Sequence, residues 1–282
     1  MDLHTLSETP PWDWPKDAGK TFGRFLKNRD VRPADRLTAA DLASNLTVLD
    51  DELANVLMTV LRDNSEPAEL RAQAAISFGP VLELASDEWF EEFDGFQDPD
   101  SVPIGKVTFR KILDAMEQTY RDTAAPKLVR RKALEGSIRA PQPWLEDAIR
   151  EAYATGDAEW MLTAVFAMQY VPDFEAEVLE ALRSADPEVH YQAVVAAGEK
   201  ELDAAWPHIF KLAKDGRTEK NLRMAAIEAI GCIRPEESAE LLKHLSASAD
   251  EDIAAAAAEA LSFDEFEDDE EEVEEDDDEE EE

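Results

Sequence analysis

Four basic residues recur at an almost constant distance behind four alanines, and they are the best candidates for a binding surface. The distances are 17, 19, 18 and 17 residues: Arg150 follows Ala133, Arg183 follows Ala164, Lys211 follows Ala193 and Lys243 follows Ala226. Guanidinium and ammonium groups bind carboxylates and phosphates. If the spacing brings the four bases to one face, they form a basic ridge that binds an acidic peptide.

The same bases have a purely structural alternative. Each would lie near the C-terminus of a helix, where a cation offsets the negative end of the helix dipole. Three of them also have an acid three residues earlier, a spacing that favours ion pairs within one helix: Asp147 precedes Arg150, Glu180 precedes Arg183 and Glu240 precedes Lys243. The sequence leaves both interpretations open.

No set of residues has the pattern of a catalytic or metal site. The histidines are scattered, at positions 4, 190, 208 and 244, and no His-Glu dipeptide, Cys-x-x-Cys motif or glycine-rich phosphate loop occurs. We expect Cys232, the only cysteine, to be a buried small hydrophobic residue rather than a nucleophile. The sequence therefore predicts a protein that is not an enzyme, with no catalytic residue, no metal and no cofactor.

The elements that must position the four bases repeat along the chain. An apolar residue followed four places later by an alanine marks the start of six repeats: Leu70–Ala74, Val129–Ala133, Trp160–Ala164, Val189–Ala193, Leu222–Ala226 and Ile253–Ala257. The last four steps are 31, 29, 33 and 31 residues, and a period of this length is typical of stacked helix pairs. Alanine lets two helices cross closely, because a bulkier side chain would push their axes apart.

From Pro126 onward the pattern predicts regular helix pairs. The first helices are predicted over residues 126–139, 157–170, 187–199, 219–232 and 250–262. The second helices are predicted over residues 143–154, 174–184, 202–214 and 236–247. Residues 38–61 predict two further helices upstream. Because such a helix pair cannot bury its apolar face alone, neighbouring pairs must cover one another.

The repeated pair resembles that of HEAT-repeat proteins, which belong to the armadillo-like helical superfamily. The resemblance covers about residues 37–262, and segments 67–75, 126–134 and 221–231 carry it most clearly. These segments place an arginine directly after the opening apolar residue: Arg71, Arg130 and Arg223. Other repeats have Met161, His190 and Ala254 there, so a polar ladder along the arginines would be interrupted.

The resemblance implies an all-α fold, a right-handed α-solenoid of about six helix pairs with the second helices on its concave face. The superfamily contains scaffolds, transport receptors, enzyme regulators and a few lyases or hydroxylases. Its iron-dependent hydroxylases rely on His-Glu pairs, and the lack of such pairs in this sequence counts against that activity.

Three segments flank or interrupt the predicted solenoid of residues 37–263. Residues 1–36 predict an extended segment and then a basic amphipathic helix that caps the first repeat, touches a membrane or receives the acidic tail. Residues 86–102 form an insertion with Trp89, Phe93 and Phe96 in an acidic setting, either a partner anchor or a cover for the solenoid edge. Residues 264–282 contain seventeen carboxylates and predict a disordered acidic tail.

The charge of the chain limits its partners. The formal net charge is −38, and removing the seventeen tail carboxylates leaves −21 for residues 1–263. Such a field repels nucleic-acid phosphates. The single cysteine, together with the lack of any run near 18 apolar residues, predicts a cytoplasmic protein without a membrane partner. We expect a monomer that binds no nucleic acid.

The function expected from the sequence is a non-catalytic protein–protein interaction scaffold or adaptor. Its partner, another protein or peptide, would bind on the concave face. One alternative is an acidic chaperone or nucleic-acid mimic that sequesters basic proteins through the tail, and another is a regulatory or lyase-type HEAT-repeat subunit. The candidate partner-binding residues are Arg150, Arg183, Lys211, Lys243, Trp89, Phe93 and Phe96.

Overall fold

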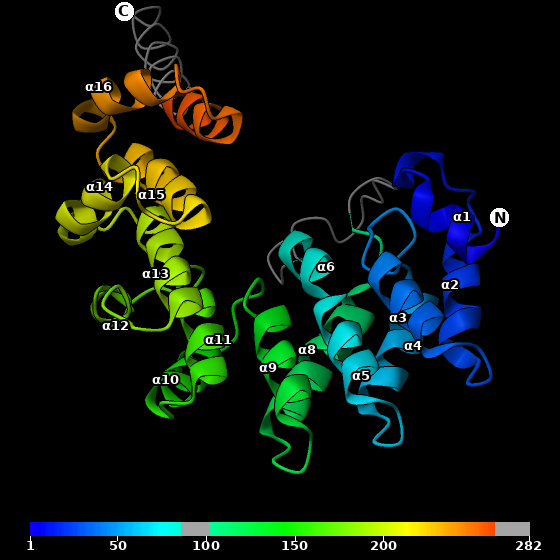
Figure 1. Ribbon diagram of the computed structural model, residues 1–282. Helices are drawn as coiled ribbons and strands as arrows, with labels where there is room; N and C mark the ends of the chain where they lie inside the picture. The colour runs from blue at the N-terminus through cyan, green and yellow to red at the C-terminus, as the bar shows by residue number, and fades with distance from the viewer. Residues whose placement is uncertain (86–101, 263–282) are drawn as a thin grey trace, which may run out of the picture. The chain divides into compact units, whose positions relative to one another are not determined.

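The computed structural model of the chain describes residues 1–85 and 102–262, and all regular elements in these ranges are helices. Figure 1 shows them following one another as packed helix pairs. The contacts divide the chain into two compact units, Met1–Glu151 and Ala152–Glu282. Stacked helix pairs in chain order are the α-solenoid that the repeats predict, so the predicted fold class is confirmed.

The first unit begins with a short helix and a single 3₁₀ turn, η1 (Pro11–Asp13), where the prolines predicted an extended segment. Its α-helices are α1 (Leu3–Glu8), α2 (Ala18–Lys27), α3 (Pro33–Leu42), α4 (Asp51–Arg62), α5 (Ala68–Ile76), α6 (Gly79–Leu84), α8 (Lys106–Arg121), α9 (Lys127–Ser137) and α10 (Leu145–Ala154), which contains the boundary between the units. Helices α3, α5 and α9 pack in one row, and α2, α4 and α8 pack in the other.

The second unit repeats this arrangement. Its helices are α11 (Ala158–Met168), α12 (Glu175–Ala181), α13 (Pro187–Glu199), α14 (Trp206–Lys214), α15 (Lys220–Ile233) and α16 (Pro235–Leu245), with a 3₁₀ turn η2 (Asp203–Ala205) and a last helix over residues 251–262. Helix α13 packs between α11 and α15. From residue 126 onward the predicted bounds of the first helices agree within two residues, and those of the second helices within four.

Aspartate caps explain why these helices begin where they do. The carboxylate of Asp186 accepts hydrogen bonds from the backbone N–H groups of Glu188 and Val189, at 2.9 and 3.2 Å. Asp157 caps α11 in the same way through Trp160 N, at 3.2 Å. A capping carboxylate satisfies backbone donors that have no partner within the helix.

Small residues set the spacing between successive first helices. The alanines that define the repeat are completely buried, Ala193 and Ala226 among them. A Cβ atom added to Gly198 of α13 would lie 2.8 Å from the Cβ of Ala229 on α15, which is too close for real atoms. Gly231 stands in the same relation to Ala260 of the last helix, whose carbonyl oxygen would lie 2.9 Å away. The first helices of the second unit therefore cross at backbone contact.

A recurring arginine contact joins each of four first helices to the helix before it. The arginine is the fourth residue of its helix, and its guanidinium donates a hydrogen bond to the carbonyl ten residues earlier. The contacts are Arg36 to Leu26 at 2.7 Å, Arg71 to Leu61 at 2.9 Å, Arg130 to Tyr120 at 2.8 Å and Arg223 to Ala213 at 3.0 Å. Each accepting carbonyl belongs to the penultimate residue of a helix, where the helix itself supplies no donor. We call these four contacts the arginine ladder.

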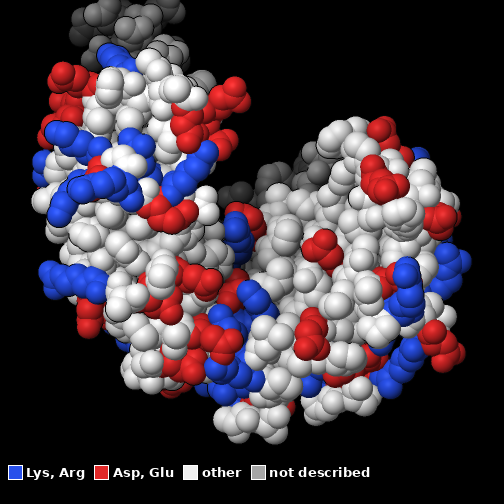
Figure 2. Space-filling view, in the orientation of Figure 1, with Lys and Arg blue, Asp and Glu red and all other residues white. Residues whose placement is uncertain are grey.

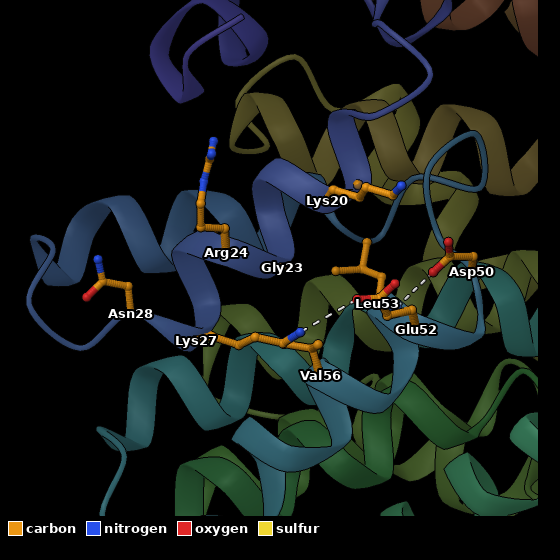
Figure 3. A pocket seen from close by; sticks show the side chains of 10 residues that line it. Lys20, Gly23, Arg24, Lys27, Asn28, Asp50, Glu52, Leu53 and Val56 are labelled. Atoms are coloured by element: carbon orange, nitrogen blue, oxygen red, sulfur yellow. Dashed lines mark hydrogen bonds and ion pairs between the residues drawn. The ribbon is translucent and has the colours of Figure 1, made fainter.

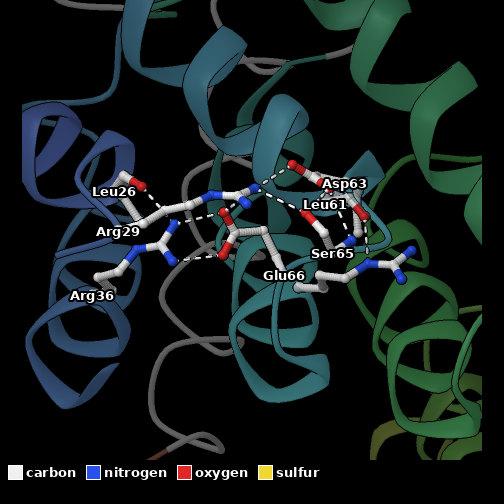
Figure 4. Close-up of polar contacts among 8 residues, drawn as sticks. Leu26, Arg29, Arg36, Leu61, Asp63, Ser65 and Glu66 are labelled. Atoms are coloured by element: carbon white, nitrogen blue, oxygen red, sulfur yellow. Dashed lines mark hydrogen bonds and ion pairs between the residues drawn. The ribbon is translucent and has the colours of Figure 1, made fainter. Parts of the chain in front are cut away.

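The first rung is reinforced by buried charges (Figure 4). Arg36 also holds the Glu66 carboxylate with both guanidinium nitrogens, at 2.5 and 3.0 Å, and both side chains are almost fully buried. Arg29 approaches the same carboxylate at 2.9 Å and Asp63 at 2.5 Å. The guanidinium of Arg36 therefore bridges the end of α2 and the loop that follows α4.

The ladder stops where its arginine is replaced, as the sequence predicted. The fourth residue of α11 is Met161, that of α13 is His190, and that of the helix over residues 251–262 is Ala254. None of these side chains carries a guanidinium, so packing must hold these helices without this contact.

We expect the substitution Arg71→Met to lower the free energy of unfolding by roughly 1–3 kcal/mol, because it leaves the buried Leu61 carbonyl without its donor. Arg62→Met, at the exposed end of α4, is the matched control and should change it by less than about 0.5 kcal/mol. Urea denaturation of the full chain measures both. Equal effects would show that the ladder hydrogen bond does not stabilise the stack.

We expect Gly198→Ala to lower the free energy of unfolding by roughly 1–3 kcal/mol, because the new methyl group overlaps Ala229. Gly216→Ala lies in the same unit, and its Cβ would have no neighbour closer than Arg223 at 4.0 Å. That control should cost less than about 0.5 kcal/mol. Thermal unfolding followed by circular dichroism compares the two variants, and a stable Gly198→Ala protein would contradict the close crossing.

Candidate functional site

Two of the four predicted bases, Arg183 and Lys211, come together beside His208. Arg183 lies two residues beyond the end of α12, and Lys211 lies one helical turn after His208 on α14. Both positive charges are close enough to lower the pKa of His208. Within the ranges that the structure describes, neither base forms an ion pair. Two cations without an ion-pair partner, in an acidic chain, are suited to attract an anion.

His208 also contacts a second histidine, His190 of α13. Their Nε2 atoms are 3.0 Å apart, and the ring centroids are 5.2 Å apart with the planes tilted by 53°. At this distance one Nε2 must carry a proton, and its N–H donates a hydrogen bond to the lone pair of the other Nε2. The contact is therefore made by a pair in which at least one imidazole is neutral.

Burial and charge favour the neutral form of both imidazoles. Partial removal from water lowers the pKa of His190, and the neighbouring His208 lowers it further. Partial removal from water also lowers the pKa of His208, and the charges of Lys211 and Arg183 lower that pKa further. We call Arg183, His190, His208 and Lys211 the cationic cluster.

His190 reaches this cluster because it occupies a ladder position. In α5, α9 and α15 the fourth residue is an arginine that contacts the preceding helix. In α13 the imidazole instead contacts α14, the helix that follows. The sequence did contain a signal for the pair: His190 and His208 are 18 residues apart, which is also the distance from Ala193 to Lys211.

The other two predicted bases do not join the cluster. Arg150 lies on α10 in the first unit, where its guanidinium pairs with Glu146 at 3.0 Å. Lys243 lies on α16 and forms no ion pair within the described residues. The charges of Arg183 and Lys211 thus both act on His208, and the four-base ridge stays a prediction.

Trp89, Phe93 and Phe96 lie outside the residues that the structure describes. The same holds for the carboxylates of segment 264–282. Their proposed roles as a partner anchor and an acidic tail therefore stay predictions.

The charged surface agrees with this assignment. Figure 2 shows lysine and arginine side chains gathered over α14 and α15 in the second unit, with acidic side chains beside them. The cluster residues Arg183, His208 and Lys211 are all exposed, and His190 is half-buried. A ligand can therefore reach the cluster from solvent.

A groove of about 570 Å³ between α2 and α4 is the alternative site (Figure 3). Its apolar floor is Leu53 and Val56, and the charged residues that line it are Lys20, Arg24, Lys27, Asp50 and Glu52. Lys27 and Glu52 form an ion pair at 3.7 Å, and Asp50 caps α4 through Leu53 N at 2.8 Å. In Figure 3 Arg24 points away from Leu53. Three bases and two acids line this groove, so its net charge is small and it selects charge only weakly.

The structure also bears on metal ligands, membrane-spanning helices and the position of Cys232. In residues 1–85 and 102–262, no three His, Cys, Asp or Glu side chains gather as metal ligands, and no helix is long and apolar enough to cross a membrane. Cys232 was expected to be buried, and that prediction is wrong because the residue is exposed. Its neighbours Gly231 and Ile233 take the buried positions of α15, which turns Cys232 outward.

Residues 175–262, from α12 to the last helix, match the family model described as HEAT repeats. This part of the chain is built of HEAT repeats. The predicted resemblance to HEAT-repeat proteins is therefore confirmed, and the cationic cluster lies inside the matched residues. A search of curated proteins finds no sequence match.

Two solved structures are similar to this chain. The Escherichia coli protein YibA is 16% identical, with a TM-score of 0.48, and the match covers 89% of this chain and 84% of that chain. Human deoxyhypusine hydroxylase, solved in complex with glycerol, is also 16% identical, with a TM-score of 0.37 and coverage of 89% and 97%. Likeness at this level transfers no activity to this chain.

The hydroxylase does correct the function expected from the sequence. We expected a non-catalytic scaffold or adaptor, partly because stacked helical repeats were taken to present surface rather than an active site. An enzyme among the structures similar to this chain contradicts that inference, because the fold is used for catalysis as well.

The lowered pKa values of His190 and His208 predict a pH-dependent stability. As the pH falls below the ordinary histidine value of 6.5, the unfolded chain binds protons that the folded pair does not accept, so the free energy of unfolding should decrease. The double substitution His190→Gln and His208→Gln should flatten this slope between about pH 7 and pH 5.

Urea denaturation at several pH values measures the slope. His244→Gln removes an exposed histidine outside the cluster and serves as the control. If the double variant kept the slope of the original protein, the pair would not be the group that titrates.

Proposed function

We propose that this protein binds an acidic segment of another protein through the cationic cluster. The observation that supports this is the meeting of Arg183 and Lys211 beside His208, with no carboxylate paired to either base in the described ranges. In a chain of net charge −38, most other bases on the second unit have acidic partners. Lys220, for example, pairs with Asp250 at 2.8 Å and Asp252 at 2.5 Å.

The chemistry of the cluster favours a carboxylate or phosphate group. An arginine guanidinium can donate two parallel hydrogen bonds to such a group, and a lysine ammonium adds a point charge. The site is open to solvent and lies on helix surfaces rather than in a deep cavity. An exposed site of this kind can receive a side chain that remains part of a polypeptide.

The size of the cluster favours a short acidic segment over a long polyanion. Residues 1–263 carry a formal charge of −21, so a nucleic-acid backbone that extended beyond the cluster would meet repulsion. A segment with a few acidic groups needs only the local positive charge. Within a HEAT-repeat stack, side chains from consecutive helices can contact such a segment.

Charge reversal of Arg183 and Lys211 to glutamate tests this proposal. Fluorescence anisotropy with a labelled oligoglutamate peptide should show at least a tenfold loss of affinity, about 1.4 kcal/mol, because two attractive contacts become repulsive. Affinity for the original protein should also fall as salt is raised from about 0.05 to 0.3 M.

The matched control reverses Arg217 and Lys243, which are exposed bases of the same unit outside the cluster. It changes the net charge by the same amount and should alter the affinity by less than about threefold. Circular dichroism establishes that both variants are folded. Equal losses in the two variants would mean that overall charge, and not this cluster, determines binding.

A further inference from the structure

The His190–His208 contact places two titratable imidazoles together at a helix position where other repeats have an arginine. In four other first helices the fourth residue is an arginine that satisfies a buried carbonyl. His190 makes no such contact within the described residues, and its Nε2 faces the Nε2 of an exposed histidine instead. The pair therefore places a titratable nitrogen next to two cations and within reach of a ligand.

The charges that face the pair are all positive or neutral. Lys211 on α14 and Arg183 after the end of α12 act on His208, and His208 acts on His190. Helices α11 and α15 also pack against this part of the unit. In the described residues, no charge on these two helices shifts the pKa of either histidine, and neither does Glu188 in the first turn of α13. Without a ligand, the field therefore resists protonation of the pair.

The proton balance of the pair is simple. In the neutral state one Nε2–H donates to the other Nε2, and each ring has its second nitrogen, Nδ1, in the opposite protonation state. One proton can add at the free Nδ1 of the donor ring and keep the contact. The cluster then carries three positive charges, from Arg183, Lys211 and one imidazolium. A second proton would place hydrogens on both Nε2 atoms and force the rings apart.

The geometry points to a phosphate-binding site: we propose that the cluster binds the phosphate group of a phosphorylated protein segment and takes up one proton at the His190–His208 pair when it does so. This inference rests on the proposed function, because it names the acidic group that the same cluster recognises. The proton comes from solvent, and no covalent bond forms or breaks.

A phosphate monoester matches the cluster better than a carboxylate does. It carries close to two negative charges at neutral pH and has three terminal oxygens that accept hydrogen bonds. The donors come from three elements: the guanidinium of Arg183 after α12, the imidazole of His190 on α13, and the His208 and Lys211 side chains on α14. A carboxylate offers one charge and two oxygens, which is too little to offset three positive charges.

Isothermal titration calorimetry of the full chain tests the proposal with two peptides of one sequence, one with phosphoserine and one with glutamate at the same position. Repeating the titrations in buffers of different ionisation enthalpy gives the number of protons taken up. We expect the phosphopeptide to bind at least tenfold more tightly and to take up a measurable fraction of one proton at pH 7.5. The glutamate peptide should take up less.

The pH series gives a second readout. Between pH 8 and pH 6.5 the phosphopeptide affinity should rise as the pH falls, by at most tenfold per unit for one linked proton. The series stays above the second pKa of a phosphate monoester, which is about 6, because protonation of the ligand would weaken binding below it. A flat or opposite profile would overturn the proposal.

The double variant His190→Gln and His208→Gln keeps both cations and should separate this inference from the proposed function. We expect it to lose both the proton uptake and the preference for phosphoserine, so that the phosphoserine and glutamate peptides bind it with affinities within about threefold of each other. If phosphoserine preference and proton uptake remained in this variant, the pair would not be their source, and the inference would fail while the proposed function stood.

Two further arms identify the source of the phosphate. Inorganic phosphate at millimolar concentration should compete with the phosphopeptide. Vesicles that contain phosphatidic acid should bind more weakly than the phosphopeptide. Stronger binding would show that the ligand is a membrane surface and not a protein segment, and would overturn the proposal. If neither peptide bound the original protein, the proposed function would fail together with this inference.

Discussion

The hydrogen bond from an arginine side chain to the penultimate carbonyl of the preceding helix is the contact on which much of the stack depends. A helix end exposes carbonyl groups that its own backbone cannot satisfy, and a buried carbonyl without a partner is costly. A guanidinium on a long stem reaches such a group from the next helix and brings a positive charge to the negative end of the dipole. Arg71 shows this most simply, because its buried Nε donates to Leu61.

The arginine ladder does not extend to every first helix, and the fourth residue differs where it is absent. Helices α11, α13 and the last helix lack the arginine. Helix α13 and the last helix approach α15 closely, at Gly198 with Ala229 and at Gly231 with Ala260. The fourth residue of a helix without the arginine does not complete a carbonyl of the preceding helix. His190 occupies such a position, and its imidazole can therefore contact His208.

The sequence predicted the helices well because the signals for them are local. Asp157 and Asp186 cap helices whose bounds were predicted within two residues, and the alanine of each repeat marks the buried seam. The helix predictions needed only the helical period and the repeat length. Spacing also predicted a shared position for Arg183 and Lys211, whose charges both lower the pKa of His208.

The rest depended on quantities that spacing does not contain. Whether Arg150 pairs with Glu146 or Asp147 depends on side-chain direction, and whether Cys232 is buried depends on the rotation of α15 about its axis. The histidine contact requires two helices to be fixed relative to each other within about an ångström. The function was harder to predict from the sequence than these contacts were, because one helical-repeat fold is used both for binding surfaces and for enzymes.

A small positive site on a strongly acidic chain has a consequence for selectivity. At physiological salt the field of a charge decays over roughly 8 Å, so the acids elsewhere act on a ligand mainly where it extends past the cluster. A ligand with its charge concentrated at one group meets Arg183 and Lys211 without the penalty that a long polyanion would meet. The neutral histidine pair sharpens this selection, because it adds its positive charge only when a sufficiently negative group is already present. The resting surface therefore avoids the repulsion among three adjacent cations, and the full charge appears only in the bound state.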